Sequence, residues 1–312
     1  MKIEYRYGEV QSAFSECVIA IGFFDGVHIA HRELIQAALE EGKRASLPVG
    51  VFTFKDSKSI KKDSSRLYSD DEKEELISSL GVDFTVFADF GSLCDLSKEE
   101  FIDKVLIRDF ACRTAVVGYN FRFGKGALGN SEYLKDYLLI KGRNCIVKEE
   151  VSSLGRTVSS SYIKELIGKG HIDAANRLLA YPYFFSATVE RGDGRGRTLG
   201  FPTVNLSLGG KEKILKSGVY RSAVAVDDRI YSAVTNIGTC PTFRERSVHS
   251  ESYIIGCNEV LYGKKIKVLL LEYLREERVF SDVESLKMQI NIDKNTVIKK
   301  NEEEKWQVYG LN

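Results

Sequence analysis

The sequence has almost no net charge, no paired cysteine motif and no long apolar run, and each absence excludes a class of protein. The 312 residues carry a formal net charge of +1, which offers no general attraction to nucleic acid or to an anionic membrane. The six cysteines form no Cys-x-x-Cys pair and lie mostly in apolar stretches, which favours reduced, buried thiols over disulfides or a zinc site. No apolar run approaches the roughly 20 residues of a membrane span, and the N-terminus lacks the apolar core of a signal peptide. We therefore expect a cytoplasmic protein that binds neither nucleic acid nor membrane.

The chain is long enough for two domains, and its first part alternates short apolar runs with helical patterns. The expected strands are Cys17–Gly22, Val49–Phe54, Asp83–Phe87, Thr114–Gly118 and Asn144–Val147. Helices are expected near 29–44, 70–80, 97–109, 130–142, 160–168 and 171–180. This alternation predicts an α/β domain, residues 1–180, with a Rossmann-like parallel sheet covered on both faces. Ligands of such sheets bind beyond the carboxyl ends of the strands.

The second part, residues 181–312, is rich in short strands. They are expected at Phe184–Glu190, Gly218–Val226, Ile230–Ile237, Ser252–Ile255 and Lys265–Glu272. Strands at this spacing predict a small antiparallel β-barrel, and Asp227-Asp228 suits a tight hairpin turn. Residues 281–291 and 294–307 are expected to form polar helices that close the chain.

The stretch from Gly22 to His31 is the most informative in the chain. It follows an apolar run and reads Gly-Phe-Phe-Asp-Gly-Val-His-Ile-Ala-His. His28 and His31 open a predicted helix, whose N-terminus favours anions, and two imidazoles there can donate hydrogen bonds to a phosphate. We expect the nucleotide to contact Gly22, Phe23, Asp25 and Gly26. The simpler alternative is that His28 caps the helix and His31 lies on its surface.

Two further segments follow other expected strands or begin helices. In Gly118-Tyr-Asn-Phe-Arg-Phe-Gly124, Asn120 can hydrogen-bond a nucleotide or orient the loop, whereas the phenylalanines suit a core better than a ligand contact. Ser159, Ser160 and Ser161 stand at a predicted helix start, followed by Lys164. Such hydroxyls cap helices, and with the helix N–H groups they can also hold phosphate.

A glycine-rich segment marks the second part. Residues 192–205 read Gly-Asp-Gly-Arg-Gly-Arg-Thr-Leu-Gly-Phe-Pro-Thr-Val-Asn. Glycines let backbone N–H groups approach phosphates closely. Thr203 and Asn205 face the same side of an extended segment and offer neutral oxygens of the kind that suit Mg²⁺ carried in with ATP. The expected nucleotide contacts are Gly192, Gly194, Arg195, Gly196 and Arg197; the alternative is a glycine-rich surface hairpin.

The motifs of residues 1–180, in this order, resemble the nucleotidyltransferase superfamily and, within it, the N-terminal module of prokaryotic bifunctional riboflavin kinase/FMN adenylyltransferases. The resemblance implies that the phosphate of FMN attacks the α-phosphorus of Mg-ATP to give FAD and pyrophosphate. It implies that His28 and His31 stabilise the transferring group. It further assigns Ser159–Ser161 and Lys164 to the ATP phosphates and Asn120 to the nucleotide and metal region.

The second part is similar to the riboflavin kinase module of the same family. Gly200-Phe-Pro-Thr-Val-Asn205 resembles its signature, and 235–243 and 275–280 match further segments. The resemblance implies that the ribityl 5′-hydroxyl of riboflavin attacks the γ-phosphorus of ATP. Glu251 matches the catalytic glutamate of the family and would be the general base, with Mg²⁺ near Thr203 and Asn205.

Several positions of the first part depart from the usual family pattern. Phe23 stands in place of Asn, Ala30 in place of Gly, Lys55–Lys58 in place of Glu-Pro-His-Pro, and Lys164 in place of Arg. Three interpretations stay open at this point. The chain is a two-site enzyme, a riboflavin kinase whose adenylyltransferase site is weakened or lost, or a non-catalytic flavin- or nucleotide-binding protein.

Overall fold

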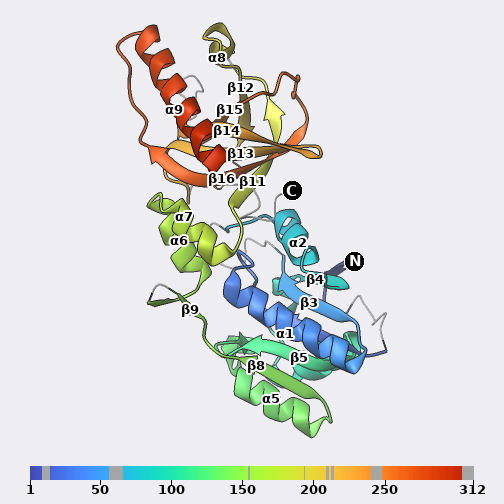
Figure 1. Cartoon of the computed structure of the whole chain (residues 1–312). Coiled ribbons are helices and arrows are strands. Elements are labelled where there is room, and N and C mark those ends of the chain that lie inside the picture. Colours follow the sequence, from blue (N-terminus) through green and yellow to red (C-terminus); the bar gives the residue numbers. More distant parts are fainter. Residues whose placement is uncertain are drawn as a thin grey trace. The chain divides into compact units, whose positions relative to one another are not determined.

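The structure is a computed structural model that describes residues 1–8, 15–55, 66–153, 155–192, 194–208, 211, 214–239 and 248–303. The chain divides into two compact units, Met1–Ser160 and Ser161–Asn312 (Figure 1). Sequence predictions that fall on 56–58, 240–243 and 304–307 lie outside the described residues.

The first unit is built on a six-stranded parallel sheet. Its strands, in spatial order, are β1 (Lys2–Tyr5), β4 (Phe84–Ala88), β3 (Val49–Phe54), β2 (Cys17–Ile21), β5 (Cys112–Gly118) and β8 (Asn144–Lys148). Every residue of β2, β3 and β4 is buried, as expected for strands that are covered on both faces. The predicted parallel sheet is confirmed. The short β1 was missed because only Tyr5 of its four residues is buried and the segment shows no apolar run.

Helices cover both faces of this sheet. They are α1 (Ile29–Ala45), α2 (Asp70–Ser78), α3 (Phe90–Leu93), α4 (Lys98–Glu100), the π-helix η1 (Phe101–Asp109), the 3₁₀ turn η2 (Lys125–Ala127) and α5 (Ser131–Ile140). Helix α1 packs on β2, β3 and β5, and η1 and α5 contribute to the hydrophobic core of the opposite face. The structure divides the helix that was expected over 97–109 into α4 and η1. Two small hairpins, β6 (Arg122–Phe123) with β7 (Gly129–Asn130) and β9 (Ser152–Ser153) with β10 (Arg156–Thr157), complete the first unit.

The strand order sets where a ligand can bind. In the sheet, β3, β4 and β1 lie on one side of β2, and β5 and β8 lie on the other. The carboxyl ends of β2 and β5 are therefore neighbours at the point where the strand order reverses. Open parallel sheets bind their ligands at such a switch point.

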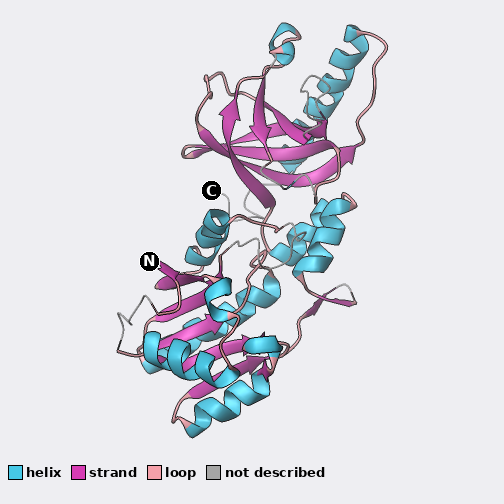
Figure 2. Cartoon of the chain, turned by 180° about the vertical axis from the view of Figure 1, so that it is seen from behind, coloured by secondary structure: helices cyan, strands magenta, loops and turns pink. Residues whose placement is uncertain are grey.

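The second unit is a closed six-stranded antiparallel barrel, seen among its helices in Figure 2. The strands, in order around the barrel, are β11 (Tyr183–Glu190), β12 (Thr203–Ser207), β15 (Val248–Ile254), β14 (Arg229–Thr239), β13 (Gly218–Val226) and β16 (Lys265–Arg275). The predicted barrel is confirmed, and so is the hairpin at Asp227-Asp228, because Val226 pairs with Arg229. The two predicted closing helices are wrong in one respect, since a single helix, α9 (Val283–Glu303), runs through both and packs on β14.

Helices α6 (Ser160–Gly168) and α7 (Ile172–Leu179) precede the barrel, and a short helix α8 (Arg195–Thr198) lies in the glycine-rich segment. Asn176 on α7 ties that helix to the barrel, because its amide donates to Leu270 O at 2.9 Å and accepts from the Tyr183 N–H at 2.7 Å. The compact second unit thus includes α7, and the functional boundary between residues 180 and 181 stays a prediction.

The cysteines are free thiols in the described part of the chain, and two of them, Cys17 and Cys112, are fully buried as expected. Cys94 is exposed, contrary to that expectation. It follows the short helix α3, whose turn leaves the side chain at the surface.

Candidate active site in each unit

The turn between β2 and α1 has a strained backbone. Phe24, Gly26 and Val27 adopt φ values of +50°, +94° and +40°. Phe24 and Val27 are fully buried, so two bulky residues occupy the left-handed region that normally favours glycine. Such conformations persist only where the surroundings hold them, and they gather at functional sites.

Hydrogen bonds from four separate segments hold this turn in place. The donors are the Thr53 hydroxyl to Phe23 O at 2.9 Å, the Ser160 hydroxyl to Asp25 O at 2.6 Å, Arg32 Nε to Val27 O at 3.2 Å, and the Leu67 N–H to the Asp25 carboxylate at 2.9 Å. Asp25 therefore orders the turn through both its main chain and its side chain. Gly22 and Gly26, with Phe23, form the rest of the predicted nucleotide loop.

The two histidines lie against each other at the start of α1. Their rings are stacked with centroids 3.6 Å apart and planes 15° apart, and His31 also packs on Phe24. His28 is at the N-cap position but makes no side-chain cap bond, so the capping alternative does not account for it. The Nδ1 atoms of both rings are buried without a hydrogen-bond partner among the described residues.

The histidine pair is held in its neutral form. Burial lowers the pKa of His28 to about 4. Burial, then His28 and Lys73, lowers the pKa of His31 well below its ordinary value. At neutral pH the stacked rings therefore do not repel each other, and each keeps one N–H with which to donate to an anion.

Asn120 lies at the neighbouring strand end. It follows β5, and a Cβ atom placed on Gly118 would come within 3.4 Å of the Asn120 Oδ1 atom. The switch point thus brings the carboxyl ends of β2, with its histidine turn, and β5, with Asn120, to adjacent positions. Phe123 is buried in the core and stacks on Phe121, which agrees with the expectation that these rings are core rather than ligand contacts.

The serine motif is divided between two roles. The Ser160 hydroxyl is used on the turn, as described above, so it does not simply cap α6. Ser161 and Lys164 follow along α6 in the second unit. Their contact with ATP phosphates, and that of Ser159, stays a prediction.

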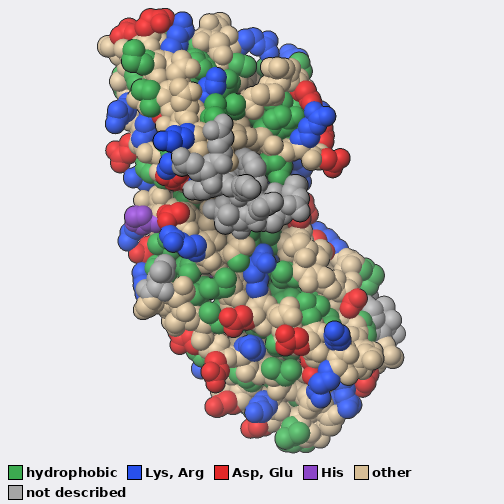
Figure 3. All heavy atoms as spheres, in the orientation of Figure 1, with side chains coloured by type: hydrophobic (Ala, Val, Ile, Leu, Met, Phe, Trp, Pro, Cys, Tyr) green, Lys and Arg blue, Asp and Glu red, His purple; other side chains and the backbone are tan. Residues whose placement is uncertain are grey.

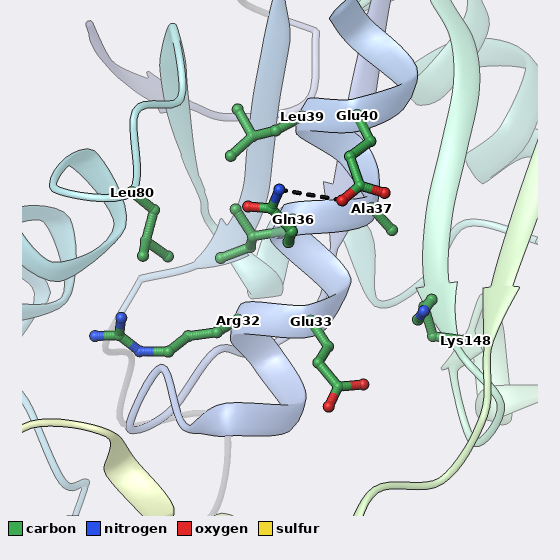
Figure 4. A pocket seen from close by; sticks show the side chains of 9 residues that line it. Arg32, Glu33, Gln36, Ala37, Leu39, Glu40, Leu80 and Lys148 are labelled. Atoms are coloured by element: carbon green, nitrogen blue, oxygen red, sulfur yellow. Dashed lines mark hydrogen bonds between the residues drawn. The ribbon is translucent and has the colours of Figure 1, made fainter. Parts of the chain in front are cut away.

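A separate hollow of about 540 Å³ lies along the exposed face of α1 (Figure 4). Arg32, Gln36 and Glu40 line it from α1, where the Gln36 amide donates to Glu40, and Leu80 and Lys148 line it from neighbouring segments. None of the residues predicted from the sequence lines this hollow. We therefore place the candidate site at the histidine turn, where the strained backbone and the unpartnered ring nitrogens are.

Lys73 and Thr53, which the sequence analysis did not propose as site residues, support the turn. Lys73 on α2 is buried, and its ammonium donates to Thr53 Oγ1 at 3.2 Å and to Phe54 O at 2.8 Å. In the sequence, Lys73 stands within Asp-Asp-Glu-Lys-Glu-Glu and looks like part of a solvated helix face. The only sequence feature that pointed to this contact was the position of Thr53 near the end of a predicted buried strand.

In the second unit, the glycine-rich segment turns back onto β12. A Cβ atom on Gly192 would lie 2.2 Å from the Asn205 Nδ2 atom, and one on Gly196 would lie 3.2 Å from Thr203 Oγ1. Gly194 has a φ of +71°. The segment therefore approaches the two predicted Mg²⁺ ligands so closely that side chains at Gly192 and Gly196 would not fit.

Strand register places Glu251 beside Asn205. Asn205 on β12 pairs with Glu251 on β15, which in turn pairs with Asn236 on β14. The flanking residues Leu206 and Ser250 are fully buried, so the three polar side chains occupy the opposite face of the barrel wall. Thr203, two residues from Asn205, shares that face. The structure therefore brings Glu251 beside Thr203 and Asn205, which the sequence analysis placed together in another segment.

Asn236 and Glu277 extend this polar row. The Asn236 amide donates to Glu277 at 3.0 Å, and its Oδ1 atom is buried without a partner among the described residues. The Glu277 carboxylate also occupies the space where a side chain on Gly238 would lie. The sequence indicated these positions only through the family segments 235–243 and 275–280.

The backbone of Arg195 lies on α8 and Arg197 is part of the same short helix.

On the face drawn in Figure 3, acidic and basic side chains are interspersed. Within the described residues, no helix is long and apolar enough to cross a membrane, and no group of three or more His, Cys, Asp or Glu side chains is arranged to hold a metal ion.

Comparisons with known proteins bear on both units. The sequence model of the FAD synthetase family matches residues 10–162, and that of the riboflavin kinase family matches residues 179–300. The bifunctional riboflavin kinase/FMN adenylyltransferase of Bacillus subtilis (strain 168) is 32% identical over 306 residues, which cover 95% of this chain and 96% of the relative. The protein of the same name from Escherichia coli (strain K12) is 32% identical over 286 residues, 90% of this chain and 91% of the relative.

A solved structure shares the architecture of the chain. It is named a macrolide-efflux protein from Streptococcus pneumoniae, and it aligns with a TM-score of 0.86 and 27% identity over 95% of this chain and 98% of that chain. The FAD synthetase match includes the histidine turn, and the riboflavin kinase match includes the glycine-rich segment and Glu251. The chain therefore belongs to the family of bifunctional riboflavin kinase/FMN adenylyltransferases.

Proposed function

We propose that this protein makes FMN from riboflavin in its barrel and FAD from FMN at the histidine turn, using ATP in both reactions. The single observation that carries the proposal is that each unit presents candidate catalytic side chains in a defined geometry. The stacked His28–His31 pair stands on a strained phosphate-binding turn, and Glu251 stands in register with Asn205. A protein that only binds flavin needs neither a base nor a phosphate-activating pair.

For adenylyl transfer, an oxygen of the FMN phosphate forms a bond to the α-phosphorus of ATP. The bond from that phosphorus to the oxygen bridging the α- and β-phosphates breaks, and pyrophosphate leaves. The neutral histidines donate hydrogen bonds to phosphoryl oxygens as negative charge develops on them. The N-terminus of α1 adds its dipole and N–H groups to the same region, and we assign Ser159, Ser161, Lys164 and Asn120 to holding the nucleotide.

For the kinase reaction, the ribityl 5′-hydroxyl of riboflavin forms a bond to the γ-phosphorus of ATP. The bond from that phosphorus to the oxygen bridging the β- and γ-phosphates breaks, and ADP leaves. The Glu251 carboxylate accepts the hydroxyl proton, a task that requires an oriented base. Gly192 and Gly196 lie close to β12, which supports our assignment of backbone N–H groups of this segment to the ATP phosphates.

The oxygens of Thr203 and Asn205 suit the Mg²⁺ that accompanies ATP. Gly196 leaves open the space beside Thr203 Oγ1 that a Cβ atom would fill. Two neutral protein oxygens fit Mg²⁺ because this ion keeps waters and substrate phosphates as its other ligands. When bound, the ion neutralises charge on the phosphates. We include a cytoplasmic location in the proposal, which agrees with the free cysteines of the described chain.

The test is a chromatographic assay on the purified protein. The protein is incubated with Mg-ATP and either riboflavin or FMN, and FMN and FAD are resolved over time. We expect FAD from both flavins, with FMN as a transient product of riboflavin. FMN from riboflavin without FAD from either flavin would reject the adenylyltransferase half of the proposal, and attention would turn to Ala30 and Lys164. No product from either flavin would reject the proposal entirely.

A further inference from the structure

Lys73 is a buried cation beside the histidine turn. The residue is 2% exposed, and burying an ammonium group is costly unless it is well partnered. Its Nζ atom donates to Phe54 O at 2.8 Å and to Thr53 Oγ1 at 3.2 Å, and a carboxylate oxygen of Asp70 lies 3.6 Å away. The Phe87 ring closes one side, with its centroid 5.0 Å from Nζ.

Thr53 connects this cation to the turn. Its side chain is fully buried, and its hydroxyl accepts a hydrogen bond from Lys73 while it donates one to Phe23 O at 2.9 Å. A hydroxyl that accepts from a cation is polarised and becomes a better donor. Phe23 directly precedes the strained residues of the turn, so the relay from Lys73 ends on the backbone that sets the position of His28.

We propose that Lys73 is a positioning residue for adenylyl transfer: through the Thr53 hydroxyl it holds the Phe23 carbonyl, and it supplies a fixed positive charge behind the neutral histidine pair. Lys73 does not touch substrate, because its ammonium is enclosed by β3, β4 and its own helix. The inference deepens the proposed function and rests on it. It gives the site a cation at neutral pH, which the two neutral imidazoles do not provide.

The charge of Lys73 makes a pH dependence part of the inference. The ionisable groups that face it are Asp70 on its own helix, Arg66 just before that helix, Asp25 in the turn and His31 on α1. Burial is the largest influence and lowers the pKa of Lys73 to about 8. The ammonium is therefore present at neutral pH and is lost as the pH rises through about 8, so the rate of FAD formation should fall over that range.

The experiment uses the full chain with four variants. Thr53→Val removes the relay hydroxyl and keeps the shape, and Thr53→Ser keeps the hydroxyl. Lys73→Met removes the charge and both hydrogen bonds that the ammonium donates. Lys73→Arg keeps a charge that does not titrate below about pH 12. For each protein, kcat and KM of FAD formation from FMN are measured from pH 6 to pH 10, and riboflavin phosphorylation in the same preparation is the internal control.

We expect Thr53→Val and Lys73→Met to lower kcat for FAD formation by about ten-fold, with little change in KM for FMN, because a displaced turn lowers the rate more than the binding. Thr53→Ser should keep most of the wild-type rate of FAD formation, because it retains the hydroxyl. The fall in rate above pH 8 should be absent in Lys73→Met and in Lys73→Arg. A fifth variant that combines Thr53→Val with Lys73→Met should be little worse than Lys73→Met alone, because the two residues act in one relay. FMN formation should be unchanged throughout.

Several results would overturn the inference. Wild-type kcat in Thr53→Val and Lys73→Met would show that the relay does not position the turn. If either of these variants failed to fold, seen as loss of hydrogen-exchange protection in β2 and β3, Lys73→Arg would decide. A fall in rate above pH 8 that persists in Lys73→Arg would then reject the role of Lys73. Failure of the wild-type protein to make FAD would instead reject the proposed function, and this inference with it.

Discussion

The two units place their candidate chemistry on different parts of their folds. In the parallel sheet, His28 and His31 follow a strand and stand on a turn held by hydrogen bonds from distant segments. In the barrel, Asn205 and Glu251 stand on the strands themselves, opposite each other in the ladder. A turn can store backbone strain, whereas a strand ladder fixes positions through register alone.

This difference predicts different weaknesses. The first site depends on single hydrogen bonds to the carbonyl oxygens of the turn, so small changes far away in sequence should disturb it. The second site depends on strand pairing and on the close fit of the glycine-rich segment. Because the barrel is closed, each of its strands pairs with a neighbour on both sides. Because the two reactions occur in one chain, each activity is the internal control for changes made in the other unit.

The largest effect should come from Glu251→Gln, which removes the base and keeps the size of the side chain. FMN formation should fall by roughly 10²–10⁴-fold, whereas FAD formation from supplied FMN should not change. Both rates are measured by the same chromatographic assay. Glu259→Gln, at an exposed position of the same unit, is the matched control, and retention of full kinase activity in Glu251→Gln would refute the assignment of the base.

A nearly equal effect, confined to the other reaction, should follow His28→Ala. Loss of one donor to the reacting phosphate should lower FAD formation by about 10²–10³-fold and leave FMN formation intact. His171→Ala is the matched control, because His171 is exposed at the start of α7 and makes no side-chain cap bond. If both reactions were lost together in His28→Ala, the separation of the two sites would be wrong.

A smaller effect should follow Gly192→Ala. The added Cβ atom would lie 2.2 Å from Asn205 Nδ2, so Asn205 or the glycine-rich segment must move by more than about 1 Å to reach an ordinary contact distance. We expect riboflavin phosphorylation to fall on the order of ten-fold. Gly168→Ala on α6 provides the control, because its Cβ atom would meet Ile214 O at an ordinary 3.6 Å. Equal rates in the two variants would show that the close approach has no functional role.

The smallest effect concerns stability. The pKa of His28 is about 4 in the folded chain and 6.5 in the unfolded chain, because burial disfavours the charged ring. The unfolded chain therefore binds more protons between these values, and the stability of the first unit should decline as the pH falls from 6.5 to 4, by up to about 3 kcal/mol. Calorimetry at pH 7 and pH 4.5 measures this, and His28→Phe should show less acid sensitivity. An equal decline in His28→Phe would assign the acid sensitivity to other groups.

Local sequence patterns were sufficient for most of the secondary structure. The strands Val49–Phe54 and Gly218–Val226 have the predicted bounds, because both are rich in the apolar and β-branched residues that favour buried strands. The prediction of secondary structure was wrong where the sequence pattern was weak or where one helix was divided into two. The polar closing segments gave two expected helices, whereas packing on β14 makes them one.

The candidate site residues divide in the same way. The histidine turn and the glycine-rich segment were predictable because phosphate binding requires particular residue types close together in sequence. The contacts of Lys73, Thr53 and Asn236 were not predictable from local patterns, because their partners are distant in sequence. Lys73 in an acidic helical segment reads as a surface residue until the fold buries it against β3.

The sequence by itself therefore determined the two fold classes, the order of the motifs and the chemistry that their residue types permit. Only the tertiary structure decided which residues meet: the strained turn beside Thr53 and Lys73, the neutral state of the stacked histidines, and the row Asn205–Glu251–Asn236. The physical reason is that propensity and periodicity act over a few neighbouring residues. Burial, ionisation state and strand register depend on segments that only folding brings together.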